Sequence, residues 1–158
     1  MCSVEECETF VKEVKKIPKI AKLLEGVKGK EPVIGCRPCS STGTEGNARA
    51  ALFDSEPLEV VLCTNRLKKD HLEEALTHEL VHAYDFSNDR ADFGYCDGLA
   101  YAEIRAARYA ECRGPFMFEW MRDSCIKQHA ISSTKNFFAD ADACVKRSFA
   151  RAMTDEAP

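Results

Sequence analysis

Two histidines four residues apart, inside a stretch with the spacing of a helix, constrain this sequence more than any other feature. The stretch begins at Asp70, which we expect to cap the first turn, with Glu73 completing a capping box. Apolar residues then recur at helical intervals as far as Tyr84. Because residues four apart lie one above the other on a helix, His78 and His82 are predicted to share one face.

The segment from His78 to His82 has the pattern His-Glu-x-x-His, which suits a zinc ion. Imidazole nitrogens bind zinc, and a catalytic zinc ion has three protein ligands and a water molecule. Glu79 follows the first histidine, where its carboxylate can take a proton from that water and pass it to a leaving amine. The composition predicts only about 0.01 chance matches to a motif of this kind. We therefore predict a zinc-dependent hydrolase in preference to two histidines that fall four apart by coincidence.

The third zinc ligand is expected on the helix that follows. Glu103 lies 21 residues after His82, far enough for a loop and half a turn of helix to return the chain to the histidines. This order of ligands is that of zincins whose third ligand is glutamate. Asp92 and Asp97 are alternative ligands, and an exposed Glu103 paired with Arg108 is the purely structural alternative.

The remaining polar side chains of interest are expected to have supporting or unrelated roles. Asp85 shares the histidine face but lies two turns from His78, about 10.5 Å along the helix axis. We therefore expect it to accept a hydrogen bond from a ligand imidazole. His71 is too far along the helix to bind the same ion, and His129 has no neighbours typical of metal ligands. Three side chains are candidates for stabilising an oxyanion, with nothing in the sequence to choose between them: Tyr84, Tyr101 and Arg105.

Hydrophobic patterns elsewhere predict an α+β fold, mostly helical, with a small sheet before the central helix. Helices are expected at 7–24, 70–84, 99–112, 116–129 and 138–153, strands at 48–53 and 58–63, and loops at 26–46 and 85–98. Pro18 would kink the first helix or begin a second one, and the apolar face of this helix is expected to pack, with partner binding as the alternative. We predict a single zincin-like domain over residues 1–158. The strand at 58–63 is expected at the sheet edge, where a substrate backbone could add as a further strand.

Composition and charge argue against several classes of protein. The chain has 158 residues, 45% of them apolar, which is the size and composition of one folded domain. No apolar run approaches the roughly 20 residues of a membrane-spanning helix, so we expect no such helix. The acidic residues 1–6 lack the apolar core of a secretory signal, so none is expected there. The net charge of −4, with dispersed basic residues, argues against nucleic-acid binding.

Nine cysteines are an unusual number for a chain of this length. They are compatible with disulfides in an oxidising compartment, with bound zinc, or with simple burial of thiols. Because nine is an odd number, at least one thiol is left over if disulfides form, and the sequence does not give the pairing. For the segment Cys36-Arg37-Pro38-Cys39 we favour a structural disulfide, with zinc binding and redox catalysis as alternatives.

The ordered set of motifs resembles the mitochondrial inner membrane metalloproteases that act in ATP synthase assembly. The likeness extends from about Cys7 to Pro158. The chain departs from the family at Tyr101, where relatives tend to have a cysteine, and it has Cys96 five residues earlier instead. It depends on these segments: residues 60–65, 77–85 and 102–106, Glu111-Cys112, Cys36-Arg37-Pro38-Cys39, Cys125 and Cys144. The zinc motif alone is shared by many proteases, whereas the ordered set is far more specific.

The resemblance implies a peripheral protein of the mitochondrial inner membrane that faces the intermembrane space and acquires disulfides during oxidative import. It implies an enzyme that removes an N-terminal extension from the a subunit of the ATP synthase and helps that subunit to join its ring. Carried over by position, His78 and His82 bind one zinc ion, and Glu79 is the catalytic acid and base. The alternative function is an assembly chaperone or scaffold with a secondary or silent protease site.

Overall fold

The structure, a computed structural model, describes residues 1–47, 50–115 and 118–158. The described chain forms two compact units: a first unit of residues 1–88 with Pro158, and a second unit of residues 89–157. Helices predominate and there is one three-stranded sheet, in agreement with the predicted mostly helical α+β class. Among the described residues, no helix combines the length and hydrophobicity needed to cross a membrane.

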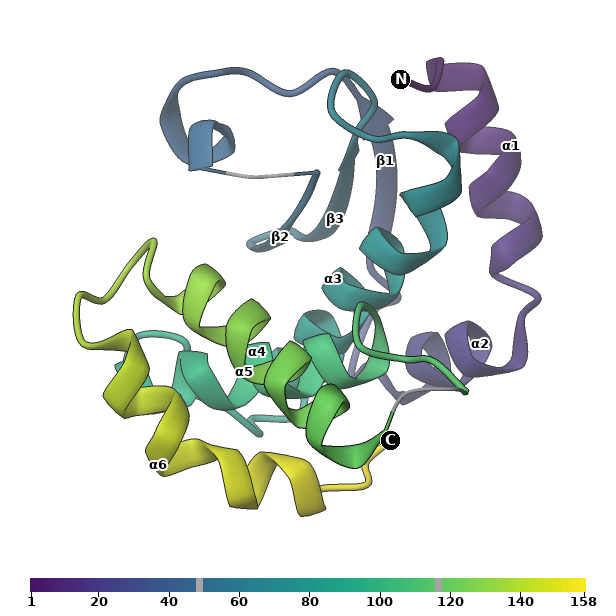
Figure 1. Ribbon diagram of the computed structural model, residues 1–158. Coiled ribbons are helices and arrows are strands. Elements are labelled where there is room, and N and C mark those ends of the chain that lie inside the picture. Colours follow the sequence, from purple (N-terminus) through teal and green to yellow (C-terminus); the bar gives the residue numbers. More distant parts are fainter. Residues whose placement is uncertain (48–49, 116–117) are drawn as a thin grey trace. The chain divides into compact units, whose positions relative to one another are not determined.

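The first unit combines helices with the sheet (Figure 1). Its elements follow in order: α1 (Val4–Val14), α2 (Pro18–Gly26), β1 (Val33–Arg37), the 3-10 turn η1 (Gly43–Asn47), β2 (Ala51–Ser55), β3 (Leu58–Cys63), the 3-10 turn η2 (Lys69–His71) and α3 (Leu72–Ser87). The strand order is β1-β3-β2, with β1 parallel and β2 antiparallel to β3. Val61 of β3 lies opposite Gly35 on one side and Leu52 on the other.

The sheet differs from the prediction in two respects. The central strand is β3, so the prediction that it lies at the sheet edge is wrong. The strand β1 lies within the region predicted as a loop, because five residues interrupted by Gly35 have too little alternation to indicate a strand. Parallel pairing with β3 and the disulfide Cys7–Cys36 hold it instead. The strand β2 begins at Ala51, and its predicted start at 48–49 lies outside the described residues.

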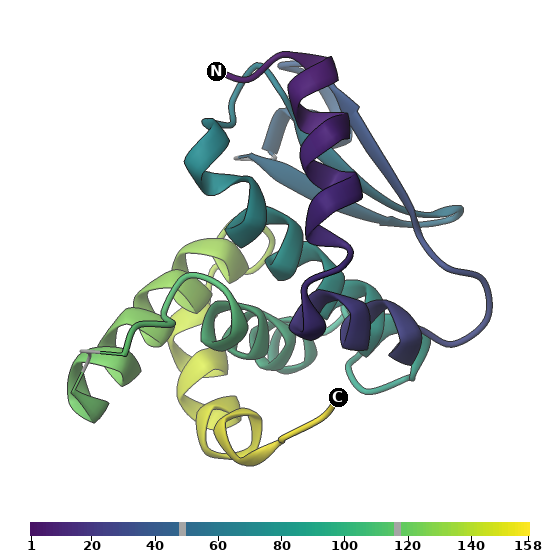
Figure 2. The same ribbon diagram turned by 90° about the vertical axis from the view of Figure 1, so that its right-hand side faces the viewer.

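Pro18 divides the predicted first helix into two. It occupies the first position of α2, where the missing N–H costs no hydrogen bond. The helix α1 begins with a capping box, in which the Ser3 hydroxyl accepts from the Glu6 N–H and the Glu6 carboxylate accepts from the Ser3 N–H. Figure 2 shows α1 beside β1, and its buried side chains are Cys7, Val11 and Val14. The predicted packing role of this helix is therefore confirmed.

The helix α3 packs against β2, β3 and α2, and it carries the histidine motif. The facing residues of the sheet are fully enclosed, since residues 60–63 of β3 are at most 1% exposed. The predicted capping box at Asp70 and Glu73 is wrong. Asp70 lies within η2, His71 is the N-cap and makes no side-chain cap bond, and the Glu73 carboxylate pairs with Lys19 at 2.8 Å.

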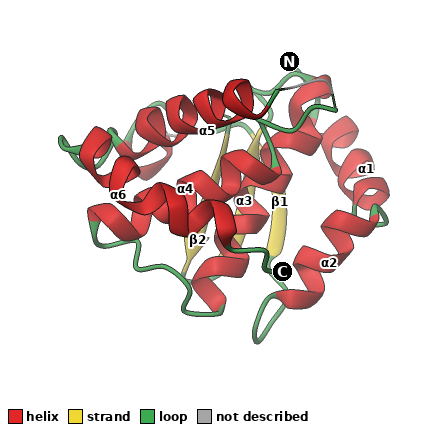
Figure 3. Ribbon diagram, turned by 60° about the horizontal axis from the view of Figure 1, so that its bottom comes forward, coloured by secondary structure: helices red, strands yellow, loops and turns green. Residues whose placement is uncertain are grey.

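The described residues of the second unit form three helices: α4 (Cys96–Tyr109), α5 (Glu119–Thr134) and α6 (Ala141–Thr154). They lie side by side, and each pair is in contact (Figure 3). Their shared core is built from alanine, isoleucine, valine and cysteine side chains. The predicted helices at 99–112, 116–129 and 138–153 all exist with shifted ends, and residues 116–117 lie outside the described residues.

The helix α4 begins at Cys96, earlier than predicted, and it includes Gly98. We expected residues 85–98 to form a loop, but Gly98 lies inside the first turn of α4. A Cβ atom at this position would be 2.0 Å from the backbone carbonyl oxygen of Asp92. The glycine is present because the preceding loop passes directly against the helix, and not because the chain turns there.

Candidate metal centre

The histidine pair of α3 forms the core of the site. The Nε2 atoms of His78 and His82 are 3.1 Å apart, and the rings meet edge to face with centroids 4.7 Å apart. One residue before the pair, the Thr77 hydroxyl donates to the carbonyl of Glu73 at 2.7 Å. A spacing of four residues on a continuous helix therefore brings the two imidazole nitrogens to one point.

The distance between the two nitrogens fits a single zinc ion. With zinc–nitrogen bonds of about 2.0–2.1 Å, two nitrogens on one ion can be at most about 4.2 Å apart, and roughly 3.3 Å at a tetrahedral angle. The observed 3.1 Å lies within this limit. The same distance allows a hydrogen bond between the rings, in which one Nε2 would carry the proton and donate. The pair can thus hold a metal ion without a change in the backbone.

The histidine pair and the neighbouring Glu79 are largely removed from water. His82 is 6% exposed, Glu79 is 9% exposed, and His78 is partly buried. A carboxylate removed from water is costly unless it is compensated by a partner or a cation. A cation bound by the adjacent imidazoles would compensate the charge of Glu79.

Glu103 lies on α4, in the second unit, and is 8% exposed. The structural alternative of an exposed Glu103 paired with Arg108 does not hold, because the glutamate is buried and Arg108 donates to the carbonyls of Ala152, Met153 and Asp155. The role of Glu103 as the third ligand stays a prediction.

The two alternative ligands have other partners. Asp97 is exposed and forms an ion pair with Arg147, whose guanidinium lies 2.7 Å from one carboxylate oxygen. This hydrogen bond, together with the charge of Arg147, lowers the pKa of Asp97. Asp92 is also exposed, and its carboxylate accepts a hydrogen bond from the Gly94 N–H at 2.9 Å. The carboxylates of Asp92 and Asp97 are thus exposed and engaged by other groups, whereas Glu103 is buried.

The other polar side chains singled out in the sequence are Asp85, His71 and His129. Asp85 is fully buried on α3, and its proposed hydrogen bond to a ligand imidazole stays a prediction. The His71 side chain is 60% exposed, and its ring nitrogen lies 3.9 Å from a Glu74 carboxylate oxygen. The prediction for His129 is wrong, because ligand atoms of Cys112 and Cys125 lie within 4.8 Å of its ring nitrogen.

Two of the candidates for oxyanion stabilisation are engaged elsewhere. Arg105 is fully buried and donates to the carbonyls of Asp155 and Ala157, at 3.0 and 2.6 Å. The Tyr101 hydroxyl donates to the Asp155 carboxylate. These contacts fasten the C-terminal segment of the second unit to α4. No sequence pattern indicated a buried arginine, because its partners are backbone carbonyls 50 and 52 residues away.

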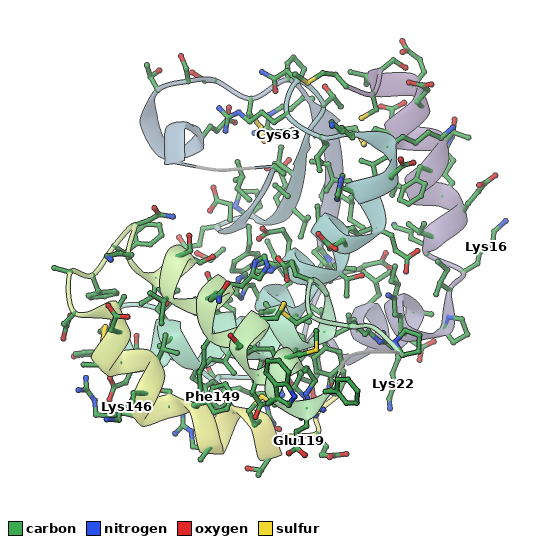
Figure 4. The ribbon with its side chains drawn as sticks, viewed as in Figure 1. Lys16, Lys22, Cys63, Glu119, Lys146 and Phe149 are labelled. Atoms are coloured by element: carbon green, nitrogen blue, oxygen red, sulfur yellow. A yellow bond between two sulfur atoms is a disulfide. The ribbon has the colours of Figure 1, made fainter. Side chains whose placement is uncertain are left out.

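The cysteines form four disulfides, two in each unit. Cys36 and Cys39 both belong to disulfides, but the disulfide expected within this segment does not form. Those two cysteines bond to different partners and not to one another. The pairs are Cys7–Cys36, Cys39–Cys63, Cys96–Cys144 and Cys112–Cys125, with Cys2 free and buried. Cys63, labelled in Figure 4, thereby ties the end of β3 to the loop that follows β1.

Comparison with known proteins places the chain in a family. A family model described as the peptidase M76 family matches residues 3–158. The chain belongs to the peptidase M76 family. Its curated relatives include the mitochondrial inner membrane protease atp23 of Neosartorya fischeri, 35% identical over 115 residues, and that of Mycosarcoma maydis, 33% identical over 116 residues.

These alignments cover 65% of this M76 chain, and 45% and 52% of the two relatives. The chain therefore spans about half the length of the curated relatives it matches. No solved structure matches it. Membership of a metallopeptidase family implies a metal ion, and the histidine pair of α3 is a candidate to bind it.

Proposed function

We propose that this member of the peptidase M76 family is a zinc-dependent endopeptidase that binds one zinc ion per chain. Its zinc ligands would be His78, His82 and Glu103, and its catalytic acid and base would be Glu79. The observation that carries the proposal is the 3.1 Å separation of the two Nε2 atoms, on a buried helix that also carries the glutamate. The family membership supports the same chemistry.

The histidines and the glutamate of α3 would have different roles in peptide hydrolysis. A bound zinc ion would polarise the scissile carbonyl and lower the pKa of a water molecule to about 7. His78 and His82 would hold the ion and remain neutral imidazoles. The Glu79 carboxylate would accept the proton of the attacking water and then donate it to the nitrogen of the leaving amine.

Glu103 is proposed as the third ligand on the basis of its chemistry. It is a buried carboxylate that follows the motif by one loop and part of one helix, whereas Asp92 and Asp97 are exposed and have other partners. We keep the proposal of a single zincin-like domain over residues 1–158.

An extended substrate would add to an edge strand of the sheet. Since β3 is central, the available edges belong to β1 and β2. The strand β1 is tied to α1 by the disulfide Cys7–Cys36, whereas β2 packs against α3. We therefore propose β2 as the strand that pairs with the substrate backbone.

The substrate and the location are proposed from the relatives. The curated relatives are named mitochondrial inner membrane proteases, and four disulfides fit an oxidising compartment. We place this protein at the inner membrane, attached peripherally on the intermembrane-space side. Its substrate would be the precursor of the ATP synthase a subunit, with a second role in the assembly of that subunit.

The substitution Glu79→Gln tests the proposal. It should leave the zinc content at one ion per chain and reduce peptide cleavage by about 10²–10⁴-fold, because only the proton acceptor is lost. Glu74→Gln is the matched control, since that glutamate lies on the same helix with its side chain 44% exposed. Unchanged cleavage by Glu79→Gln would refute the assignment.

The same variant separates proteolysis from assembly. In cells lacking the protein, we expect Glu79→Gln to abolish precursor processing, and assembly of the ATP synthase is scored independently. Retained assembly would show a chaperone role that does not need the protease site. Assembly lost together with processing would argue against the chaperone alternative.

A further inference from the structure

A second group of metal-binding atoms lies in the second unit, around the disulfide Cys112–Cys125. Cys125 and His129 are four residues apart on α5, so they share one helical face. Cys112 follows α4 and completes the group. The two sulfur atoms and a ring nitrogen of His129 lie within 4.8 Å of one another. The proposed peptidase site uses none of these three residues.

The spacing of this group is close to that of a zinc site. With zinc–sulfur bonds of about 2.3 Å, two sulfurs on one ion are at most about 4.6 Å apart. A sulfur and a nitrogen on one ion are at most about 4.4 Å apart, and the observed separations of up to 4.8 Å are close to these limits. The Cα atoms of Cys112 and Cys125 are 5.8 Å apart, so both thiols can turn toward one point without movement of the backbone. Two thiolates and an imidazole are ligands that zinc prefers.

The oxidation state of the pair decides whether these ligands are available. In the disulfide, neither sulfur carries the thiolate charge that a metal ion needs. Every disulfide is formed from two thiols, so the dithiol form exists before oxidation and again after reduction. Cys112 is 1% exposed and belongs to the core of the second unit, whereas Cys125 and His129 are partly exposed, so water can reach the group.

We infer that the dithiol form of Cys112 and Cys125 binds one zinc ion together with His129, and that zinc binding and disulfide formation compete. On metal binding the two thiols release two protons, and the fourth position is left to water. On oxidation the two thiolates transfer two electrons to a disulfide such as glutathione disulfide. The protein disulfide forms, two glutathione thiolates are produced, and the zinc ion is released.

The other disulfides provide internal comparisons. Cys96–Cys144 has Asp140 as its third group, but an exposed carboxylate is a harder and more strongly hydrated ligand than imidazole. Cys39–Cys63 in the first unit has no such third group among the residues that the structure describes. Zinc should therefore stabilise the dithiol form most strongly at Cys112–Cys125.

The redox equilibrium of each pair tests the inference. The protein is equilibrated in glutathione buffers of fixed ratio, with free zinc set by a chelator, and the thiols are alkylated and counted pair by pair by mass spectrometry. At a free zinc concentration 100 times the Kd, the dithiol-to-disulfide ratio of Cys112–Cys125 should rise about 100-fold. This rise corresponds to a shift of about 59 mV in the reduction potential. The ratio of Cys39–Cys63 should not change.

Removing the imidazole tests the role of the third ligand. His129→Ala should reduce the zinc-dependent rise to about tenfold or less, since even groups that only support a ligand contribute 10–100-fold to metal affinity. His71→Ala, which removes an exposed histidine, should leave the rise intact. An equal rise in His129→Ala or at Cys39–Cys63, or no rise in the wild type, would overturn the inference.

Cobalt provides a second, spectroscopic readout. In a buffer that reduces Cys112–Cys125, Co²⁺ should produce thiolate-to-cobalt charge-transfer absorption in the wild type that is markedly weaker in Cys112→Ser/Cys125→Ser. Equal absorption in both proteins would contradict the inference. The histidines of α3 offer no sulfur, so failure of the peptidase proposal would leave this absorption unchanged.

Discussion

Two pairs of side chains in this protein share a spacing of four residues on a helix but differ in what they can bind. His78 and His82 on α3 present two Nε2 atoms 3.1 Å apart, and neither atom is covalently blocked. Cys125 and His129 on α5 have the same spacing, but the sulfur of Cys125 is bonded to Cys112. Helical spacing thus sets the geometry of a metal site, whereas the chemical state of each ligand decides whether the site can be filled.

The largest expected difference between the two pairs is in the oxidised protein. His82→Ala should remove the bound zinc and reduce peptide cleavage more than 100-fold, because loss of a direct ligand costs more than the roughly 10–100-fold of a supporting group. His129→Ala should change neither. Metal analysis and peptide cleavage on the same samples measure both effects. Equal loss of zinc in the two variants would show that the pairs do not differ as described.

The third ligand gives the next largest effect. Glu103→Gln should weaken zinc binding about 100-fold or more, since a neutral amide replaces a carboxylate ligand. Asp97→Asn is the matched control, because its carboxylate is engaged by Arg147. Competition with a chelator of known affinity measures the change. Normal zinc affinity in Glu103→Gln, with weakened affinity in Asp97→Asn, would transfer the role to Asp97.

The two disulfides of the second unit should differ in their contribution to stability. Cys96–Cys144 spans 48 residues, and Cys112–Cys125 spans 13. Loop-closure entropy predicts that replacing the longer pair with serines costs about 1 kcal/mol more in unfolding free energy than replacing the shorter pair. Denaturant unfolding of the two double variants measures this difference. The opposite order would show that enthalpic effects outweigh the chain entropy.

The smallest effect concerns the ion pair between Asp97 and Arg147. Arg147 lowers the pKa of Asp97 in the folded protein. The stabilisation is therefore fully present above the unfolded pKa of about 3.9 and is lost as the pH falls through the lower folded value. Asp97→Asn should flatten the pH dependence of unfolding in this acidic range and leave it unchanged at neutral pH. A change confined to neutral pH would contradict this assignment.

The parts of the fold that sequence could predict are those with local signals. The strand at 58–63 was predicted with its observed ends, and Pro18 indicated the start of α2. The short strand β1 and the central position of β3 depend on pairing between distant segments, which no local pattern records. Gly98 was assigned to a loop because its tertiary contact with Asp92 has no signature in the sequence.

The candidate site shows the same division. The motif on α3 follows from residue spacing, and the structure brings the two nitrogens together. The neighbours of His129 could not be predicted, because Cys112 is 17 residues away and belongs to a disulfide whose pairing is a tertiary property. The burial of Arg105 likewise depends on the distant C-terminal segment.

The most direct measurement is the anomalous diffraction of a crystal of the oxidised protein, recorded on either side of the zinc absorption edge. The account predicts one zinc peak per chain, bonded to Nε2 of His78, Nε2 of His82 and the carboxylate of Glu103. A crystal grown with zinc that shows no peak there, with the two rings hydrogen-bonded to one another, would contradict it.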